Sequence, residues 1–162
     1  MYYKYIPSPL GRLLLGGQTS ILEMIGFPEG KGDVSPGDDW IHDNSVFKQA
    51  EDQLNEYFEG ERQRFDLKMK PSGTPFQLSV LAALQDIPFG QTTSYRNIAE
   101  SIGRPKAVRA VGSANGRNPL PIVIPCHRVI GADGSLTGFG GGLAAKSFLL
   151  NLESAGFNLA SQ

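Results

Sequence analysis

A segment containing proline and glycine, residues 70–73, divides this 162-residue chain into two parts with different hydrophobic patterns. Before this segment, short apolar stretches alternate with Pro and Gly, which is typical of strands. Directly after it, Thr-Pro-Phe-Gln at 74–77 forms a capping box with proline at the first helical position, which predicts the start of a helix. We therefore expect an α+β fold with a small N-terminal α/β domain, residues 1–72, and a helical C-terminal domain, residues 73–162.

The N-terminal part is expected to contain three short antiparallel strands. Residues 2–6, 13–15 and 21–25 are rich in aromatic, β-branched and leucine side chains. A glycine pair at 16–17 is expected to end the second strand, because glycine disfavours strand interiors.

One helix and one more strand are expected to complete this part. Asn44 is the predicted N-cap, and Gly60 marks the predicted helix end. The apolar residues at helical spacing between them are Phe47, Ala50, Leu54 and Phe58. Phe65 and Leu67 indicate the additional strand.

The C-terminal part begins with three short helices. The first runs from 75 to a point before Pro88, the second over 94–102, and the third from 105 to about 116. Gly103 separates the second from the third, which is typical of a helix-turn-helix. Helical hairpins that do not bind DNA share this pattern, so the pattern alone does not decide the function.

A hairpin and a last helix are expected to follow. Residues 128–130 and 135–137 flank Gly-Ala-Asp-Gly at 131–134, which predicts two paired strands and, with the preceding helices, a winged-helix-like domain. The final helix is expected over 143–155, with Gly156 as its stop.

The third helix carries an unusual number of small residues beside the cations Lys106 and Arg109. These small residues are Ala107, Ala110, Gly112, Ser113 and Ala114. A surface of small residues lets the helix backbone come close to a binding partner, either a DNA groove or another protein helix. A glycine inside a helix costs about 1 kcal/mol relative to alanine, so Gly112 indicates a packing or functional benefit.

Charge is distributed unevenly along the chain. The net charge is −1, but residues 1–73 hold 8 Lys/Arg against 12 Asp/Glu, and residues 74–162 hold 7 against 4. Between 96 and 128, six Lys/Arg accompany only Glu100. Such a basic segment favours phosphate binding. The alternative is an ordinary solvated surface, which can carry the same number of basic residues without binding a ligand.

Cys126 is the only cysteine, so it has no partner for an internal disulfide. It follows the apolar run 122–124 and precedes His127 and Arg128, whose basic groups favour the reactive thiolate. The alternative is a small, inert core residue. Neighbouring side chains in a strand point to opposite faces, so coupling Cys126 to His127 requires a bend or helical turn at 125–128.

Taken together, these segments resemble the O6-alkylguanine-DNA alkyltransferases (methylated-DNA–protein-cysteine methyltransferases). The resemblance rests on Ile-Pro-Cys-His-Arg-Val at 124–129 and is reinforced by Ser-Tyr-Arg at 94–96, the helix sequence 105–112 and Asn-Pro at 118–119. It continues through the glycine-rich stretch to Glu153 and covers most of the C-terminal part. The N-terminal part contributes little.

This resemblance implies DNA repair by direct damage reversal. Cys126 would take the alkyl group from O6-alkylguanine, and possibly from O4-alkylthymine, in double-stranded DNA, and each molecule would react once. His127, a bridging water and Glu153 would activate Cys126. Asn118 would shape the turn that supports the site, and Arg128 would hold the two parts of the protein together. No cofactor is implied.

The resemblance also implies that the damaged nucleotide is flipped out through the minor groove. Arg109 would replace the flipped base, and Tyr95 would crowd the phosphate and contact the guanine. The small face of the helix suits a groove only about 6 Å wide. The other residues implied in substrate or DNA contact are Ser94, Arg96, Ala107, Ala110, Gly112, Ser113, Val129, Phe139 and Gly140, and Pro125 has a structural role.

Two features of this chain limit the resemblance. Phe139 stands where some relatives have tyrosine, so one hydroxyl group is missing. Residues 1–73 contain no Cys and only His42, so we expect no structural zinc.

The chain has no apolar run of roughly 18 residues and no signal segment. We therefore expect no membrane contact and a location inside the cell, in the cytoplasm, or in the nucleus if eukaryotic. A monomer is also expected.

Three other functions are compatible with parts of the pattern. A non-catalytic protein of the alkyltransferase-like type would bind the lesion only, but such proteins lack the nucleophile. A cysteine hydrolase would use the same Cys–His–carboxylate set on esters or peptides. A redox sensor would react with peroxide without DNA.

Overall fold

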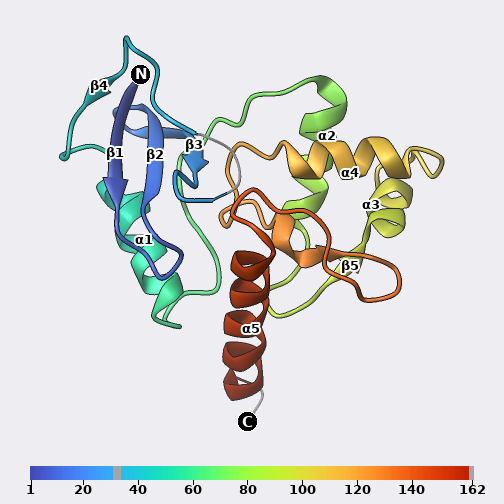
Figure 1. Cartoon of the computed structure of the whole chain (residues 1–162). Coiled ribbons are helices and arrows are strands. Elements are labelled where there is room, and N and C mark those ends of the chain that lie inside the picture. Colours follow the sequence, from blue (N-terminus) through green and yellow to red (C-terminus); the bar gives the residue numbers. More distant parts are fainter. Residues whose placement is uncertain (31–33, 161–162) are drawn as a thin grey trace.

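The computed structural model describes residues 1–30 and 34–160. A small sheet and one helix lie on one side, three helices lie on the other, and α5 extends between them (Figure 1). The predicted α+β class is confirmed. In chain order the elements are β1 (Tyr2–Ile6), β2 (Leu13–Gln18), β3 (Ile21–Gly26), β4 (Ile41–His42), α1 (Lys48–Phe58), α2 (Pro75–Gln85), β5 (Thr93–Ser94), α3 (Tyr95–Ser101), α4 (Val108–Gly116), η1 (Cys126–Arg128), β6 (Val129–Ile130) and α5 (Leu143–Ala160).

The N-terminal sheet has the strand order β3-β2-β1-β4, with β1, β2 and β3 antiparallel and β4 parallel to β1. The prediction that the glycine pair ends β2 is wrong, because Gly16 and Gly17 lie inside the strand, at a bulge. Gly17 has φ 154°, and a Cβ there would lie 2.2 Å from the carbonyl oxygen of Ile21. Glycine therefore permits the close approach of β3 instead of stopping β2.

The start of α1 differs from its prediction. Asn44 is not the cap, since the helix begins at Lys48 and its N-cap residue is Phe47, with φ 57° and no side-chain cap. The preceding residues form a turn in which the carboxylate of Asp43 accepts hydrogen bonds from the amide and hydroxyl of Ser45. That local turn competes with a helical conformation at Asn44.

The additional strand predicted at Phe65 and Leu67 is absent, because the segment is extended but forms only one isolated bridge, between Leu22 and Met69. A side chain replaces the missing ladder. Gln53 of α1 accepts from the Asp66 amide at 2.9 Å and donates to the Asp66 carbonyl at 3.0 Å.

The helix-turn-helix prediction is largely correct. Thr74 and Gln77 form the capping box of α2, and Ser94 caps α3 by accepting from the Asn97 amide. The third helix, α4, begins at Val108 rather than at residue 105, because residues 105 and 106 form a turn closed by the Ala107 amide bonding to the Arg104 carbonyl.

The predicted hairpin is not formed. β6 pairs in parallel with β5, with Thr93 opposite Val129, instead of pairing with residues 135–137. The turn itself is present, since the Gly131 amide bonds to the Ser135 carbonyl. Thr137 is held differently: its carbonyl accepts from Lys146 at 3.1 Å, and its hydroxyl bonds to Tyr95. These side-chain contacts replace a second strand.

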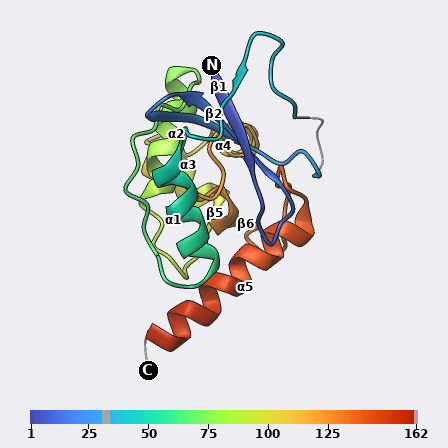
Figure 2. The same cartoon turned by 90° about the vertical axis from the view of Figure 1, so that its left-hand side faces the viewer.

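α5 continues through Gly156 to Ala160, so the predicted stop at Gly156 is wrong. A glycine lowers helix propensity but does not end a helix by itself. Lys146, Leu149 and Glu153 of α5 are buried at 0%, 0% and 1% exposure and share one face. α5 passes beneath α1 and the sheet when the molecule is turned by 90° (Figure 2). None of the helices in residues 1–30 and 34–160 is long and apolar enough to cross a membrane.

Candidate active site

A strained turn presents the cysteine. The apolar run 122–124 resembles a strand in sequence, but it forms a tight turn closed by a bridge between Pro121 and Ile124. Ile122 is 1% exposed with φ 76°, a conformation that costs a β-branched residue about 1–3 kcal/mol. The side chain of Asn118 spans this turn, donating to the Ile124 carbonyl at 2.8 Å and accepting from the Leu120 amide at 3.0 Å.

A short helical turn follows and orients the reactive residues. η1 covers Cys126–Arg128 directly after Pro125, so the bend expected at 125–128 is present. A strand would have placed Cys126 and His127 on opposite faces, whereas the helical turn removes this alternation. Cys126 is 5% exposed and His127 is fully buried.

Glu153 of α5 is the centre of a buried hydrogen-bond network. Its Oε2 accepts from Nε2 of His127 at 2.5 Å and from the hydroxyl of Tyr57 at 2.5 Å. Its Oε1 accepts from Nε of Arg128 at 2.7 Å, and Nη2 of the same guanidinium reaches Oε2 at 3.1 Å. The Gly90 amide lies 3.4 Å from Oε1. The carboxylate therefore accepts hydrogen bonds from four residues in three segments of the chain.

The network fixes the protonation of His127. Burial raises the pKa of the Glu153 carboxyl, but the hydrogen bonds and charges of His127 and Arg128 outweigh burial and lower this pKa to about 2. Burial lowers the pKa of His127 against the opposing effect of Glu153. A neutral His127 that donates from Nε2 carries its lone pair on Nδ1, which is buried without a hydrogen-bond partner among the described residues. Nδ1 is thus the atom that can accept a proton.

The thiol of Cys126 is not activated at rest. Burial raises its pKa to about 11, and hydrogen bonding by Asn118 and the charge of Lys146 offset only part of this effect. Since the thiolate is the reactive form of cysteine, Cys126 needs a base to become a nucleophile. The buried imidazole of His127, next to it in sequence, is the candidate base.

Lys146 is a site residue that the sequence analysis missed. It is fully buried on α5, and its Nζ donates to the Val129 carbonyl at 2.6 Å and to the Thr137 carbonyl at 3.1 Å. These bonds tie β6, the 131–137 turn and α5 together behind Cys126. The available signal was its position seven residues before Glu153, which places both on one helix face.

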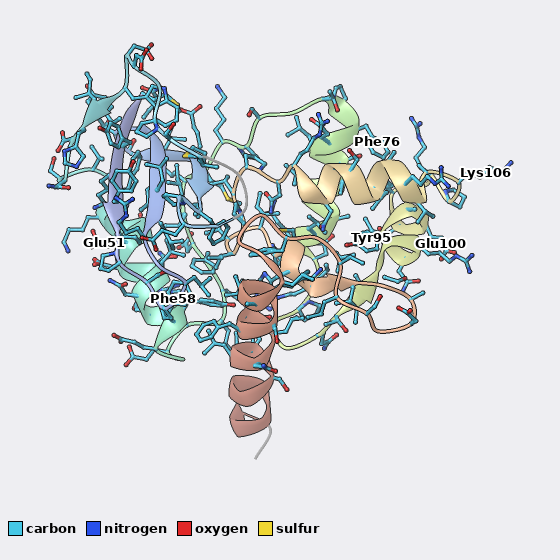
Figure 3. All side chains as sticks on the ribbon, viewed as in Figure 1. Glu51, Phe58, Phe76, Tyr95, Glu100 and Lys106 are labelled. Carbon is cyan, nitrogen blue, oxygen red and sulfur yellow. The ribbon has the colours of Figure 1, made fainter. Side chains whose placement is uncertain are left out.

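Two cavities open around the cysteine. The first, about 260 Å³, is lined by Cys126, Asn115, Asn118 and Phe139 among others. The second, about 560 Å³, is lined by Tyr95, Val108, Gly112 and Thr137, and the two share the wall Gly116, Gly138, Phe139 and Gly140. Figure 3 shows Tyr95 between α4 and the 131–142 loop. Cys126 therefore lines the first cavity and Tyr95 the second, and the two cavities adjoin along their shared wall.

The outer surface of α4 is basic and small, as expected. Arg109, Ala110 and Ser113 are exposed, and Gly112 is half-buried beside the Tyr95 ring. Arg96 of α3 is also exposed, whereas Val129 is fully buried.

Two residues grouped with the basic, small surface of this segment lie inside instead. Ala114 is 3% exposed and packs in the core. Arg128 is 7% exposed and neutralised by Glu153, so it adds no charge to the surface for phosphates. Within residues 1–30 and 34–160, no group of three or more His, Cys, Asp or Glu could hold a metal ion.

Known proteins are similar to this chain in sequence and in fold. Residues 75–155 match the 6-O-methylguanine DNA methyltransferase DNA-binding domain, and residues 1–71 match the ribonuclease-like domain of the same family. The methylated-DNA–protein-cysteine methyltransferase of Methanosarcina acetivorans is 50% identical over 155 residues, which cover 96% of this chain and 99% of that protein. The protein of the same name from Mycobacterium tuberculosis is 48% identical, with 96% and 93% covered.

Solved structures agree with these relatives. Mycobacterium tuberculosis OGT in complex with DNA superposes with a TM-score of 0.91 at 47% identity, covering 96% of this chain and 94% of that one. The O6-methylguanine DNA methyltransferase of Methanococcus jannaschii gives a TM-score of 0.64 at 30% identity, covering 93% of each chain.

The buried Cys–His–Glu arrangement, the fold and these similarities place the chain in the 6-O-methylguanine DNA methyltransferase family. Its activity is that of a methylated-DNA–protein-cysteine methyltransferase, an enzyme of direct-reversal DNA repair. The predicted family, function and enzyme class are therefore confirmed, and the non-catalytic lesion-binding alternative is not favoured.

Proposed function

We propose that this enzyme repairs O6-methylguanine in double-stranded DNA by moving the methyl group to Sγ of Cys126. The observation that carries the proposal is the buried Glu153–His127 pair, bonded at 2.5 Å, next to a cysteine that lines a cavity. His127 takes the thiol proton, and the thiolate attacks the methyl carbon as the carbon–O6 bond breaks. The guanine leaves with that electron pair and takes up one proton, which restores the normal base.

The base in this step is Nδ1 of His127. Glu153 holds Nε2 and stabilises the imidazolium that forms when Nδ1 is protonated. A water between Nδ1 and Cys126 would carry the proton, because Nδ1 is buried and has no hydrogen-bond partner among the described residues. The resulting thioether has no reverse step, so one molecule of protein repairs one base.

α4 is the element proposed to enter the minor groove. Its exposed small residues allow close approach, and Arg109 stands in the first turn of the helix, where it can fill the gap left by the flipped base. Tyr95 lines the second cavity and stacks on or contacts the extruded guanine there. Exposed Arg96, Lys106 and Arg117 bind phosphates on either side.

The remaining assignments concern the state of the protein. Asn118 is proposed to hold the turn before Cys126, and Arg128 to join α5 to the segment at Ile87, whose carbonyl it reaches at 2.7 Å. We also propose that the protein acts as a monomer inside the cell, where its single thiol stays reduced.

Restoration of a restriction site tests this proposal. A duplex with O6-methylguanine inside a restriction site resists cleavage until the methyl group is removed. The wild-type protein is expected to restore cleavage of an amount of duplex equal to the amount of protein, and Cys126→Ser is expected to restore none while still binding the duplex. Binding by the wild type without any restored cleavage would contradict the proposal and support the lesion-binding alternative.

A further inference from the structure

One polar group of the N-terminal part, the hydroxyl of Tyr57, bonds to the proposed catalytic network. Tyr57 is near the end of α1, 1% exposed, and its hydroxyl donates to Oε2 of Glu153 at 2.5 Å although the two residues are 96 positions apart. In Figure 2 the lower end of α1 lies above α5, and the hydrogen bond between Tyr57 and Glu153 joins the two helices. This is the oxygen that also binds Nε2 of His127.

An aromatic cluster fixes the position of this hydroxyl. The Tyr57 ring packs against Phe58, Phe65 and Phe89, with centroid distances of 5.5, 5.4 and 6.3 Å. Phe89 also lies under the guanidinium of Arg128 at 5.8 Å. The ring therefore has little freedom, and its hydroxyl is held on Glu153 by packing as well as by the hydrogen bond.

The charges around the shared oxygen give this bond a defined effect. The groups facing Glu153 are His127 and Arg128 from η1 and Tyr57 from α1. Lys146 lies about two helical turns before Glu153 on the same face of α5. Burial and the Glu153 charge raise the pKa of the Tyr57 phenol, so it remains a donor. A donor on a carboxylate stabilises the anion and reduces its attraction for the imidazolium proton.

We propose that Tyr57 is a positioning residue of the transfer reaction, through which the N-terminal part sets the orientation of Glu153 and the basicity of His127. The proposal rests on the proposed function of His127 as the base. It gives the sheet and α1 a role in the chemistry besides support of the fold.

Tyr57→Phe tests this role because it keeps the ring and removes one donor. We expect single-turnover transfer from an O6-methylguanine duplex to slow about tenfold at the optimum, the effect of one hydrogen bond to a charged group. The acidic limb of the rate–pH profile is expected to move to higher pH, since Glu153 then holds the His127 proton more strongly. Affinity for undamaged duplex should not change, because Tyr57 is buried away from α4.

Phe65→Leu is the matched control. It loosens the packing on the same ring and leaves the hydroxyl in place, so it should lower the thermal midpoint of unfolding without moving the pH limb. An equal shift of the limb in Phe65→Leu would mean that packing, not the hydrogen bond, is responsible, and would overturn the proposal.

A second substitution covers the case in which Tyr57→Phe does not fold. Site-specific 3-fluorotyrosine at position 57 keeps the ring and makes the hydroxyl a stronger donor, so the acidic limb should move to lower pH. An unchanged profile in a protein that still transfers methyl groups would exclude a role for Tyr57 and leave the proposed function intact. Absence of transfer in the wild type would instead contradict the proposed function.

Discussion

The same buried surroundings shift Cys126 and Glu153 in opposite directions. Burial raises the pKa of the thiol to about 11, and the hydrogen bond of Asn118 and the charge of Lys146 offset only part of this rise. The carboxyl pKa falls to about 2 because His127 and Arg128 outweigh burial. The site therefore holds a protonated thiol and an ionised carboxylate, and we propose that a base must remove the thiol proton before Cys126 can react.

Lys146→Met tests the residue that the sequence analysis missed. The substitution removes the bonds to the carbonyls of Val129 and Thr137 and the charge that lowers the pKa of Cys126. Leaving the buried Val129 carbonyl and the half-buried Thr137 carbonyl unpaired should lower the free energy of unfolding by about 1–3 kcal/mol, measured by urea unfolding. The pH midpoint for alkylation of Cys126 by iodoacetamide should rise. Lys48→Met, an exposed lysine with an 80% exposed side chain, should change neither value, and equal effects in both variants would contradict this role.

The free energy of unfolding should fall at acidic pH because of His127 and Glu153. Both folded pKa values lie below their ordinary values of 6.5 and 4.5, so the unfolded chain binds more protons as the pH falls. The free energy of unfolding should begin to fall below pH 6.5, and Glu153 adds a loss on the order of 3 kcal/mol as the pH falls from 4.5 to about 2. Urea unfolding at a series of pH values measures this. Glu153→Gln should lack the second component; if its acid dependence equals that of the wild type, Glu153 is not the group responsible.

Among the elements, α2 and α3 were the most predictable because the signals at their starts are local. The Thr74 capping box and the Ser94 cap each lie within three residues of the amide they bind. The turn at Ile122 was not predictable, because its apolar residues favour a strand and only the fold around it holds φ at 76°. The hairpin prediction failed for a related reason: β6 finds its partner in β5, which precedes it by more than thirty residues.

Arg109→Ala tests the role of α4. A wedge is needed only to flip a base out of a duplex, so repair of an O6-methylguanine duplex should slow by about tenfold or more, corresponding to about 1.4 kcal/mol. Reaction with free O6-benzylguanine should change little. Arg104→Ala, an exposed arginine outside the helix, is the control and should affect the duplex reaction less. Equal slowing of both reactions by Arg109→Ala would show that Arg109 acts on Cys126 chemistry or on folding.

At the scale of the whole molecule, the catalytic network joins parts of the chain that no local pattern connects. Cys126, His127 and Glu153 were named from the sequence because the resemblance carried them, and the structure places His127 and Glu153 2.5 Å apart. Tyr57 was not, because its spacing on α1 indicates only a core residue and its partner is 96 positions away. Buried polar contacts of this kind depend on how the sheet, α1 and α5 pack together, and a single sequence does not report that packing.

The mass of the protein after reaction tests the central claim most directly. The protein is mixed with an excess of duplex containing one O6-methylguanine, and its intact mass is measured by mass spectrometry. Peptide mapping then locates the modified residue. We expect one added methyl group per molecule, located on Cys126, with no further gain at longer times. A methyl group on another residue, repeated turnover without a mass gain, or tight binding with no gain would each contradict irreversible transfer to Cys126.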